Sequence, residues 1–108
     1  MSVVDFIVVL VTAKDRAEAE KISRSLLEEK LIACVNIVGS VTSCFLWQGK
    51  LDKAEECLLI MKSRADLFSE LLQQVKRLHS YEVPEILALP VALGSVDYLA
   101  WIQSVLKP

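Results

Sequence analysis

The strongest constraint on the fold of this chain is a pair of long extended segments joined by a very short turn. Residues 33–47 form one extended stretch with Gly39-Ser40 as a bend or bulge inside it, and residues 51–62 run back with alternating and then apolar side chains. Gln48-Gly49 lies at the turn of the resulting β-hairpin. Each arm, of about fourteen residues, would extend roughly 45 Å, whereas a compact chain of this length is only roughly 34 Å across. The hairpin should therefore overhang its own core.

Two helices are predicted from a capping pattern followed by a helical apolar period. Asp15 and Glu18 have the spacing of a capping box, and apolar residues then recur at helical period to about Glu29. Ser63 and Asp66 repeat this spacing and predict the start of a second helix. That helix carries the clearest amphipathic stripe in the chain, made of Leu67, Phe68, Leu71, Leu72, Val75 and Leu78.

The remaining elements complete the predicted order β-α-β-β-α-β-α. The β-branched run at residues 6–11 suits a covered strand, residues 86–93 form another apolar strand, and Gly94-Ser95 starts a last helix. This order is typical of an α+β, ferredoxin-like β-α-β-β-α-β sandwich with an antiparallel sheet, here with a long hairpin and an extra C-terminal helix. No linker or repeat divides the chain, so residues 1–108 are predicted to form a single domain.

Charge and hydropathy exclude several classes of partner. A net charge of -2, without a basic patch, disfavours nucleic acid and anionic lipid. The apolar runs are far shorter than the roughly 20 residues that span a membrane, and residues 1–5 lack the basic start of a signal peptide. Three cysteines without a C-x-x-C pair favour reduced thiols. We therefore expect a cytoplasmic protein with neither a nucleic-acid nor a membrane partner.

An overhanging hairpin favours self-association. It would expose unpaired backbone together with Phe45, Leu46 and Trp47, and pairing with another subunit is the usual way to cover such a surface. Trp101, on the last helix, is a further large aromatic suited to an interface. We therefore predict a homo-oligomer built through the hairpin.

The segment His79-Ser80-Tyr81-Glu82-Val83-Pro84-Glu85, called the heptad below, is the first candidate for a chemical site. His79, the only histidine, suits copper, nickel or zinc as a metal ligand, and it equally suits a cap of the preceding helix. Glu82 and Glu85 resemble an acid/base pair, but Pro84 makes the segment extended and places residues three apart on opposite sides.

Two residues outside the heptad are also candidates. Cys34 on a predicted strand is either a small buried side chain or a soft metal ligand. Asn36 lies among apolar neighbours, where an amide needs hydrogen-bond partners and commonly fixes a turn or an interface.

Four spaced motifs make the chain resemble the CutA divalent-cation tolerance family along nearly its whole length. The motifs are Ala33-Cys34-Val35-Asn36-Ile37, Trp47-x-Gly49-Lys50, Glu56 to Lys62 and Tyr81-x-x-Pro84-Glu85, and Tyr98-Leu99-x-Trp101 closes the match. The resemblance implies a ferredoxin-like subunit, a trimer assembled through the hairpins, and a link to copper and other divalent metals. Val11 and Leu78 stand where some members of the family carry Cys and a second His.

We therefore expect a divalent-cation (copper) tolerance protein that is a homotrimer and not an enzyme. No cofactor is required; copper or another divalent metal ion would be weakly bound, with His79 and Cys34 as candidate ligands.

Two alternatives remain open. The first is a trimeric signalling module similar to PII proteins, with a small ligand in clefts between subunits lined by Tyr81, Glu82, Glu85 and Asn36. The second is an acylphosphatase-like enzyme using Arg16 and Asn36, which is disfavoured because the loop at residues 12–16 has no glycine to cradle phosphate.

Overall fold

The fold is an antiparallel sheet with two helices on one face and a third helix at one end. A computed structural model describes residues 5–108, so residues 1–4, and with them most of the segment on which the signal-peptide expectation rests, lie outside the described residues. The elements in chain order are β1 (Phe6–Ala13), α1 (Arg16–Glu28), β2 (Cys34–Trp47), β3 (Lys50–Arg64), the 3-10 turn η1 (Ala65–Leu67), α2 (Phe68–Leu78), β4 (Ile86–Pro90) and α3 (Val96–Val105).

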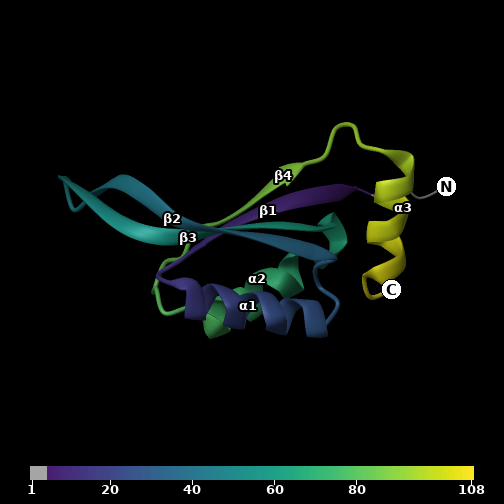
Figure 1. Ribbon diagram of the computed structural model, residues 1–108, viewed down its shortest axis with the longest axis horizontal. Coiled ribbons are helices and arrows are strands. Elements are labelled where there is room, and N and C mark those ends of the chain that lie inside the picture. Colours follow the sequence, from purple (N-terminus) through teal and green to yellow (C-terminus); the bar gives the residue numbers. More distant parts are fainter. Residues whose placement is uncertain (1–4) are drawn as a thin grey trace.

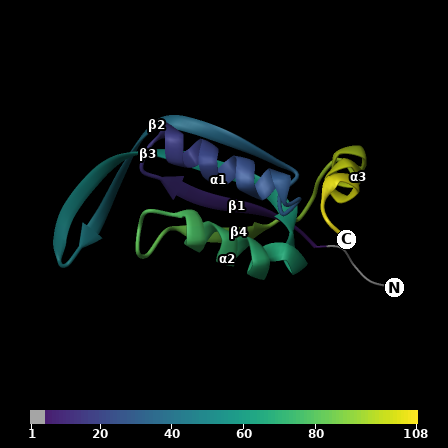
Figure 2. The ribbon, with the colours of Figure 1, turned by 90° about the horizontal axis from the view of Figure 1, so that it is seen from below.

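The sheet has the strand order β2-β3-β1-β4, and every neighbouring pair is antiparallel. Helices α1 and α2 lie side by side under one face of this sheet, while α3 stands at the end opposite the hairpin turn (Figure 1, Figure 2). This arrangement confirms the predicted ferredoxin-like order with an extra C-terminal helix. Within residues 5–108, no helix is both long and apolar enough to cross a membrane.

The core lies between the sheet and helices α1 and α2. Successive side chains of a strand point to opposite faces, so alternate residues of β1 and β3 meet the apolar stripes of the two helices. The residues that are completely buried there are Val9, Val11, Ala13, Ala19, Ile22, Leu26, Leu31, Leu59, Met61, Leu71 and Val75. The helices therefore bury one face of the sheet and do not cover the other face.

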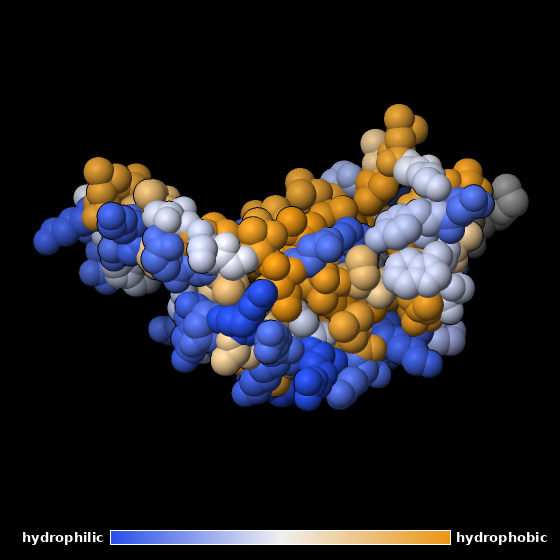
Figure 3. All heavy atoms as spheres, in the orientation of Figure 1, coloured by the Kyte–Doolittle hydropathy of each residue, from blue (hydrophilic) through white to orange (hydrophobic). Residues whose placement is uncertain are grey.

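The opposite face of the sheet, called the open face below, is also largely apolar. It carries the side chains that alternate with the buried ones along each strand. On β1 and β3 these are two cross-strand pairs, Val8 with Lys62 and Leu10 with Ile60. Leu87 and Leu89 of β4 extend this apolar surface and are about half exposed. Figure 3 shows the apolar surface on the concave side of the molecule, between the hairpin and α3.

The hairpin follows the sequence prediction closely. Trp47 pairs with Lys50, so Gln48 and Gly49 form a two-residue turn, and both have positive φ, as a type I′ turn requires. The predicted irregularity appears as a register shift between Val38 and Val41.

The far half of the hairpin projects well beyond α1 and α2 (Figure 1), and the chain measures 49 × 26 × 23 Å. The predicted overhang is therefore confirmed.

The predicted start of the second helix at Ser63 is wrong. Strand β3 continues to Arg64 because Phe6 of β1 pairs with it, and the Ser63 hydroxyl is buried and donates to the Leu31 carbonyl oxygen at 2.6 Å. Asp66 accepts from Arg64 Nε at 2.6 Å, and α2 follows η1 without a side-chain cap. Tertiary pairing thus overrides the local capping pattern.

The last strand is also shorter than the predicted 86–93. It ends at Pro90 because its partner β1 begins at Phe6, whose carbonyl accepts one further bond from Val91 N–H.

Candidate functional site

The heptad joins the end of α2 to β4, and its histidine is held at both ring nitrogens. His79 is buried and follows α2 in an extended conformation. Its Nδ1 accepts from Tyr81 N–H at 3.0 Å, which requires a lone pair there, so Nε2 carries the proton and donates to the Thr12 carbonyl oxygen at 2.6 Å. The ring therefore ties the loop to the end of β1, and the carbonyl that it satisfies belongs to β1 rather than to α2.

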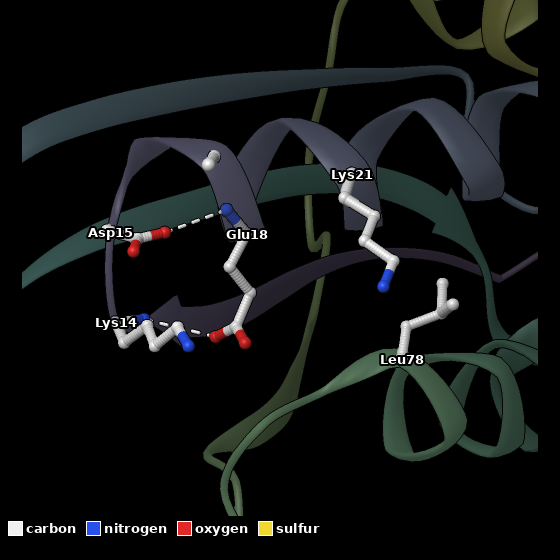
Figure 4. Close-up of a pocket in the computed structure, with 6 residues that line it drawn as sticks. Lys14, Asp15, Glu18, Lys21 and Leu78 are labelled. Carbon is white, nitrogen blue, oxygen red and sulfur yellow. Dashed lines mark hydrogen bonds between the residues drawn. The ribbon is translucent and has the colours of Figure 1, made fainter.

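Glu18 of α1 is the second anchor of this loop. Its Oε1 accepts from Lys14 N–H at 3.1 Å (Figure 4). Its Oε2 accepts from Ser80 N–H at 3.0 Å, and Oε1 lies 3.7 Å from His79 Nδ1. Burial by itself raises the pKa of Glu18, but the hydrogen bonds from Ser80 and Lys14 outweigh it and lower the pKa below its usual value. Asp15 caps α1 as predicted, accepting from Glu18 N–H at 2.9 Å. The sequence identified Glu18 only as a helix-start residue and did not predict its contact with the heptad.

Tyr81 connects the heptad to the root of the hairpin. Its hydroxyl donates to Glu56 Oε2 at 2.7 Å, and its ring lies 4.8 Å from that of His79, centroid to centroid. Burial, together with this bond to a carboxylate, raises the pKa of Tyr81 to about 12, so the phenol keeps its proton at neutral pH. Glu56, buried on β3, was not predicted as a site residue. Its sequence signal was its place at the start of the motif Glu56 to Lys62, one of those on which the resemblance to the CutA family rests.

Two open pockets flank the loop between β1 and α1. One, of about 280 Å³, lies against Lys14, Asp15, Ala17, Glu18, Lys21 and Leu78, and Figure 4 shows Lys21 of α1 on the side that faces Leu78 of α2. The other, of about 350 Å³, lies towards the hairpin and is lined by Lys14, Asp15, Ser40, Glu55, Glu56 and Cys57. Carboxylates outnumber ammonium groups in the second pocket, so its electrostatic potential favours a cation.

The two other acids of the heptad, Glu82 and Glu85, are exposed. Neither forms a hydrogen bond or an ion pair with another side chain of residues 5–108. They lie on the loop as the sequence predicts, but within the described chain they join no site.

Cys34 and Asn36 belong to a different cluster, on the open face beside α3. Lys62 Nζ donates to Asn36 Oδ1, and Lys62 is the cross-strand partner of Cys34. Cys34 Sγ lies 3.3 Å from the Tyr98 hydroxyl, and the Tyr98 ring stacks on Trp101 with centroids 5.7 Å apart. The contact with Cys34, followed by burial, raises the pKa of Tyr98. Lys62 and Tyr98 were not predicted as members of this cluster.

The two clusters are separate within one subunit. His79 bonds to the backbone carbonyl of Thr12, near the end of β1 that leads into α1, whereas Cys34 pairs with Lys62, which lies opposite Val8 near the other end of β1. Four residues of strand separate Thr12 from Val8, or roughly 13 Å. His79 and Cys34 of the same chain therefore cannot share an ion, and no three His, Cys, Asp or Glu side chains among residues 5–108 are grouped to hold one.

The residues required for an acylphosphatase-like site have other partners. Arg16 Nε lies 3.9 Å from Glu20 Oε1 on the exposed side of α1, whereas Asn36 bonds to Lys62 on the sheet.

The predicted interface residues are all exposed. The exposed fractions are 72% for Leu46 and 58% for Trp47, and Phe45 and Trp101 are also exposed. Leu46 lies directly opposite Leu51 across the hairpin, while Phe45 and Trp47 point to the other side. The end of the hairpin thus presents apolar side chains on both of its faces.

Comparisons with known proteins agree with this architecture. The sequence model described as CutA1 divalent ion tolerance protein matches residues 7–105. The divalent-cation tolerance protein CutA of Thermus thermophilus is 46% identical over 96 residues, covering 89% of this chain and 93% of the relative. The protein of the same name from Yersinia pestis is 44% identical over 98 residues, covering 91% and 82%. The crystal structure of CutA1 from Oryza sativa superposes with a TM-score of 0.93 at 40% identity, covering 96% of this chain and 95% of that one.

Proposed function

Because the chain belongs to the CutA1 divalent ion tolerance family, we propose that it acts in divalent-cation tolerance as a homotrimer. In this proposal it binds copper or related ions weakly and catalyses no reaction. The observation that carries the assembly is the apolar open face of the sheet together with the overhanging hairpin.

The open face and the hairpin end are surfaces that a single chain leaves exposed to water. Leu87, Leu89, Leu46 and Leu51 are all about half exposed or more. Contiguous apolar surface of this kind usually marks an interaction site. Since the hairpin end and the concave sheet surface are different surfaces, contact between them is head-to-tail, a kind of contact that forms a closed ring when the rotation between subunits closes. The number of subunits follows the trimer that the resemblance to the CutA family implies.

The charge distribution favours the heptad end of the sheet for a cation. Asp15, Glu55 and Glu56 line the larger pocket there, and among its lining residues from the described chain Lys14 alone carries an ammonium group. Cys34 is a less favourable position for a metal ion, because it lies directly across from Lys62. The positive charge of Lys62 repels a metal cation.

The same geometry explains why binding would be weak. His79 can offer Nδ1 to an ion only after the bond from Tyr81 N–H opens, and Nε2 is already bonded to Thr12. The described part of the chain holds no preformed group of three ligands. The coordination shell of an ion at the heptad would therefore have to be completed by water or by ligands from a neighbouring subunit.

Copper titration of the wild type and of two variants tests the metal proposal. We expect saturable binding by the wild type, lower affinity in His79→Gln, and unchanged affinity in Cys34→Ser. Glutamine keeps a polar side chain of similar reach, which limits damage to the loop. Isothermal titration calorimetry gives the affinity and the stoichiometry, with circular dichroism as the check on folding. Unchanged affinity in His79→Gln would remove His79 as a ligand, and a wild type without saturable binding would refute metal binding altogether.

A further inference from the structure

Lys62 carries a positive charge on the apolar open face. Its neighbours along β3, Met61 and Ser63, are completely buried against the helix side, so the Lys62 side chain points the other way. Its one hydrogen-bond acceptor among residues 5–108 is the neutral Asn36 amide, and no carboxylate in that range lies within salt-bridge distance.

Covering the open face would bury this ammonium group without a counter-charge. The transfer of a charge out of water is costly unless it is paired and hydrogen bonded. An assembled protein therefore needs a negative group at Lys62.

The groups around Lys62 form a set of hydrogen-bond donors. Because Asn36 Oδ1 accepts from Lys62, the amide NH₂ is directed elsewhere, and it donates to no other group of residues 5–108. Among residues 5–108 the Tyr98 hydroxyl has only Cys34 Sγ as a partner, and the ring of Trp101 stacks on the Tyr98 ring. An ammonium, an amide and a phenol thus lie on the same patch, next to the stacked rings of Tyr98 and Trp101.

Resting on the proposed assembly, we propose that Lys62, Asn36 and Tyr98 bind a small organic anion, through its carboxylate or phosphate group, on the sheet face that a second subunit covers. In this proposal the negative group belongs to a small molecule, and a carboxylate of the covering subunit is the alternative that the variants below test. Ammonium and amide donors fit oxyanions of both kinds, and the stacked rings suit the body of an organic molecule.

The test measures thermal midpoints of the wild type, Lys62→Met and Asn36→Asp, each with and without citrate or inorganic phosphate in a dilute chloride buffer. A ligand that binds only the folded protein raises its midpoint with concentration. We expect the wild-type midpoint to rise with one or both anions, and the two arms distinguish carboxylate from phosphate. Lys62→Met should lower the affinity at least about tenfold, and Asn36→Asp should abolish the response by pairing Lys62 internally.

The variants also separate a small anion from a partner carboxylate. If a small anion is the counter-charge, Lys62→Met in the anion-free buffer is at least as stable as the wild type, because an unpaired charge has been removed. If the partner's carboxylate pairs with Lys62, the same change destabilises the protein by leaving that carboxylate unpaired. The latter result, without any anion response in the wild type, overturns the inference. Lys76→Met, exposed on α2 away from the open face and the hairpin, is the matched control and should behave as the wild type.

Light scattering of the wild type distinguishes a failure of the proposed assembly from a failure of the proposed anion site. A monomer overturns the assembly and this inference with it. An oligomer whose thermal midpoint changes with neither anion overturns the anion site and leaves the assembly standing.

Discussion

At the scale of single residues, the partners of each side chain decide its role. His79 matches a metal ligand by type, yet both of its nitrogens are hydrogen bonded within the chain. Glu18 matches a capping-box residue, yet its carboxylate holds the backbone of Ser80. The heptad is thus anchored by buried polar groups at β1, α1 and β3. Because such groups are costly to leave unpaired, the loop should keep its shape without a bound ligand.

The Glu18 carboxylate should make stability depend on pH in the acidic range. Its pKa in the folded chain lies below the usual 4.5, so the unfolded chain takes up the proton first as the pH falls. The stabilisation is therefore complete above about pH 4.5 and is lost as the pH falls through the folded-state pKa. We expect Glu18→Gln to be less stable than the wild type at neutral pH and to lose less stability on acidification.

Urea unfolding followed by circular dichroism, between neutral pH and about pH 3, measures this difference. Glu28→Gln, exposed on the same helix, is the control. Parallel stability curves for the wild type and Glu18→Gln would show that the carboxylate has no such role.

At the scale of elements, the hairpin is the part of the fold that local residues specify best. Gln48 and Gly49 have φ values of 51° and 79°, in the left-handed region that glycine and asparagine tolerate well. The turn closes Trp47 against Lys50, and the bulge near Ser40 bends β2. The second helix shows the opposite behaviour, because the pairing of β3 with β1 takes Ser63 into the sheet.

Substitutions at the turn should change stability in opposite directions. Gly49→Ala forces a Cβ atom into the left-handed region and should destabilise the protein by about 1 kcal/mol. Gln48→Gly relieves the same strain and should stabilise it by up to about 1 kcal/mol. Gly39→Ala is the matched control, because a Cβ meets no atom within 4 Å at either glycine and Gly39, unlike Gly49, has no positive φ.

Chemical denaturation gives all three free energies of unfolding. Equal effects of alanine at positions 39 and 49 would contradict the turn geometry.

At the scale of the whole molecule, the two faces of the sheet differ in how they are covered. Helices α1 and α2 cover one face, while the other face and the hairpin end remain apolar and exposed. The surface therefore has two parts, a helical side with single exposed apolar residues such as Leu27 and a concave side with many.

Charges at the hairpin end should dissociate the oligomer without unfolding the subunit. Leu46 and Leu51 lie opposite each other and are 72% and 87% exposed in one chain. If a neighbouring subunit covers them, each contributes about 2 kcal/mol to association. We expect the double variant Leu46→Lys, Leu51→Lys to be smaller than the wild type by light scattering, with an unchanged circular dichroism spectrum.

Leu27→Lys, on the helix side, is the control and should leave the assembly intact. An unchanged mass for the double variant would place the interface elsewhere.

The sequence by itself determined the element order, the turn, the bulge and the overhang, because capping residues, periodicity and strand length act between neighbours in the chain. It also predicted which residues the heptad contains. Only the tertiary structure decided what those residues do, since Ser80–Glu18, Tyr81–Glu56 and Cys34–Tyr98 join positions 62, 25 and 64 apart. No local pattern carries such a pairing, because it depends on how the strands and helices pack together.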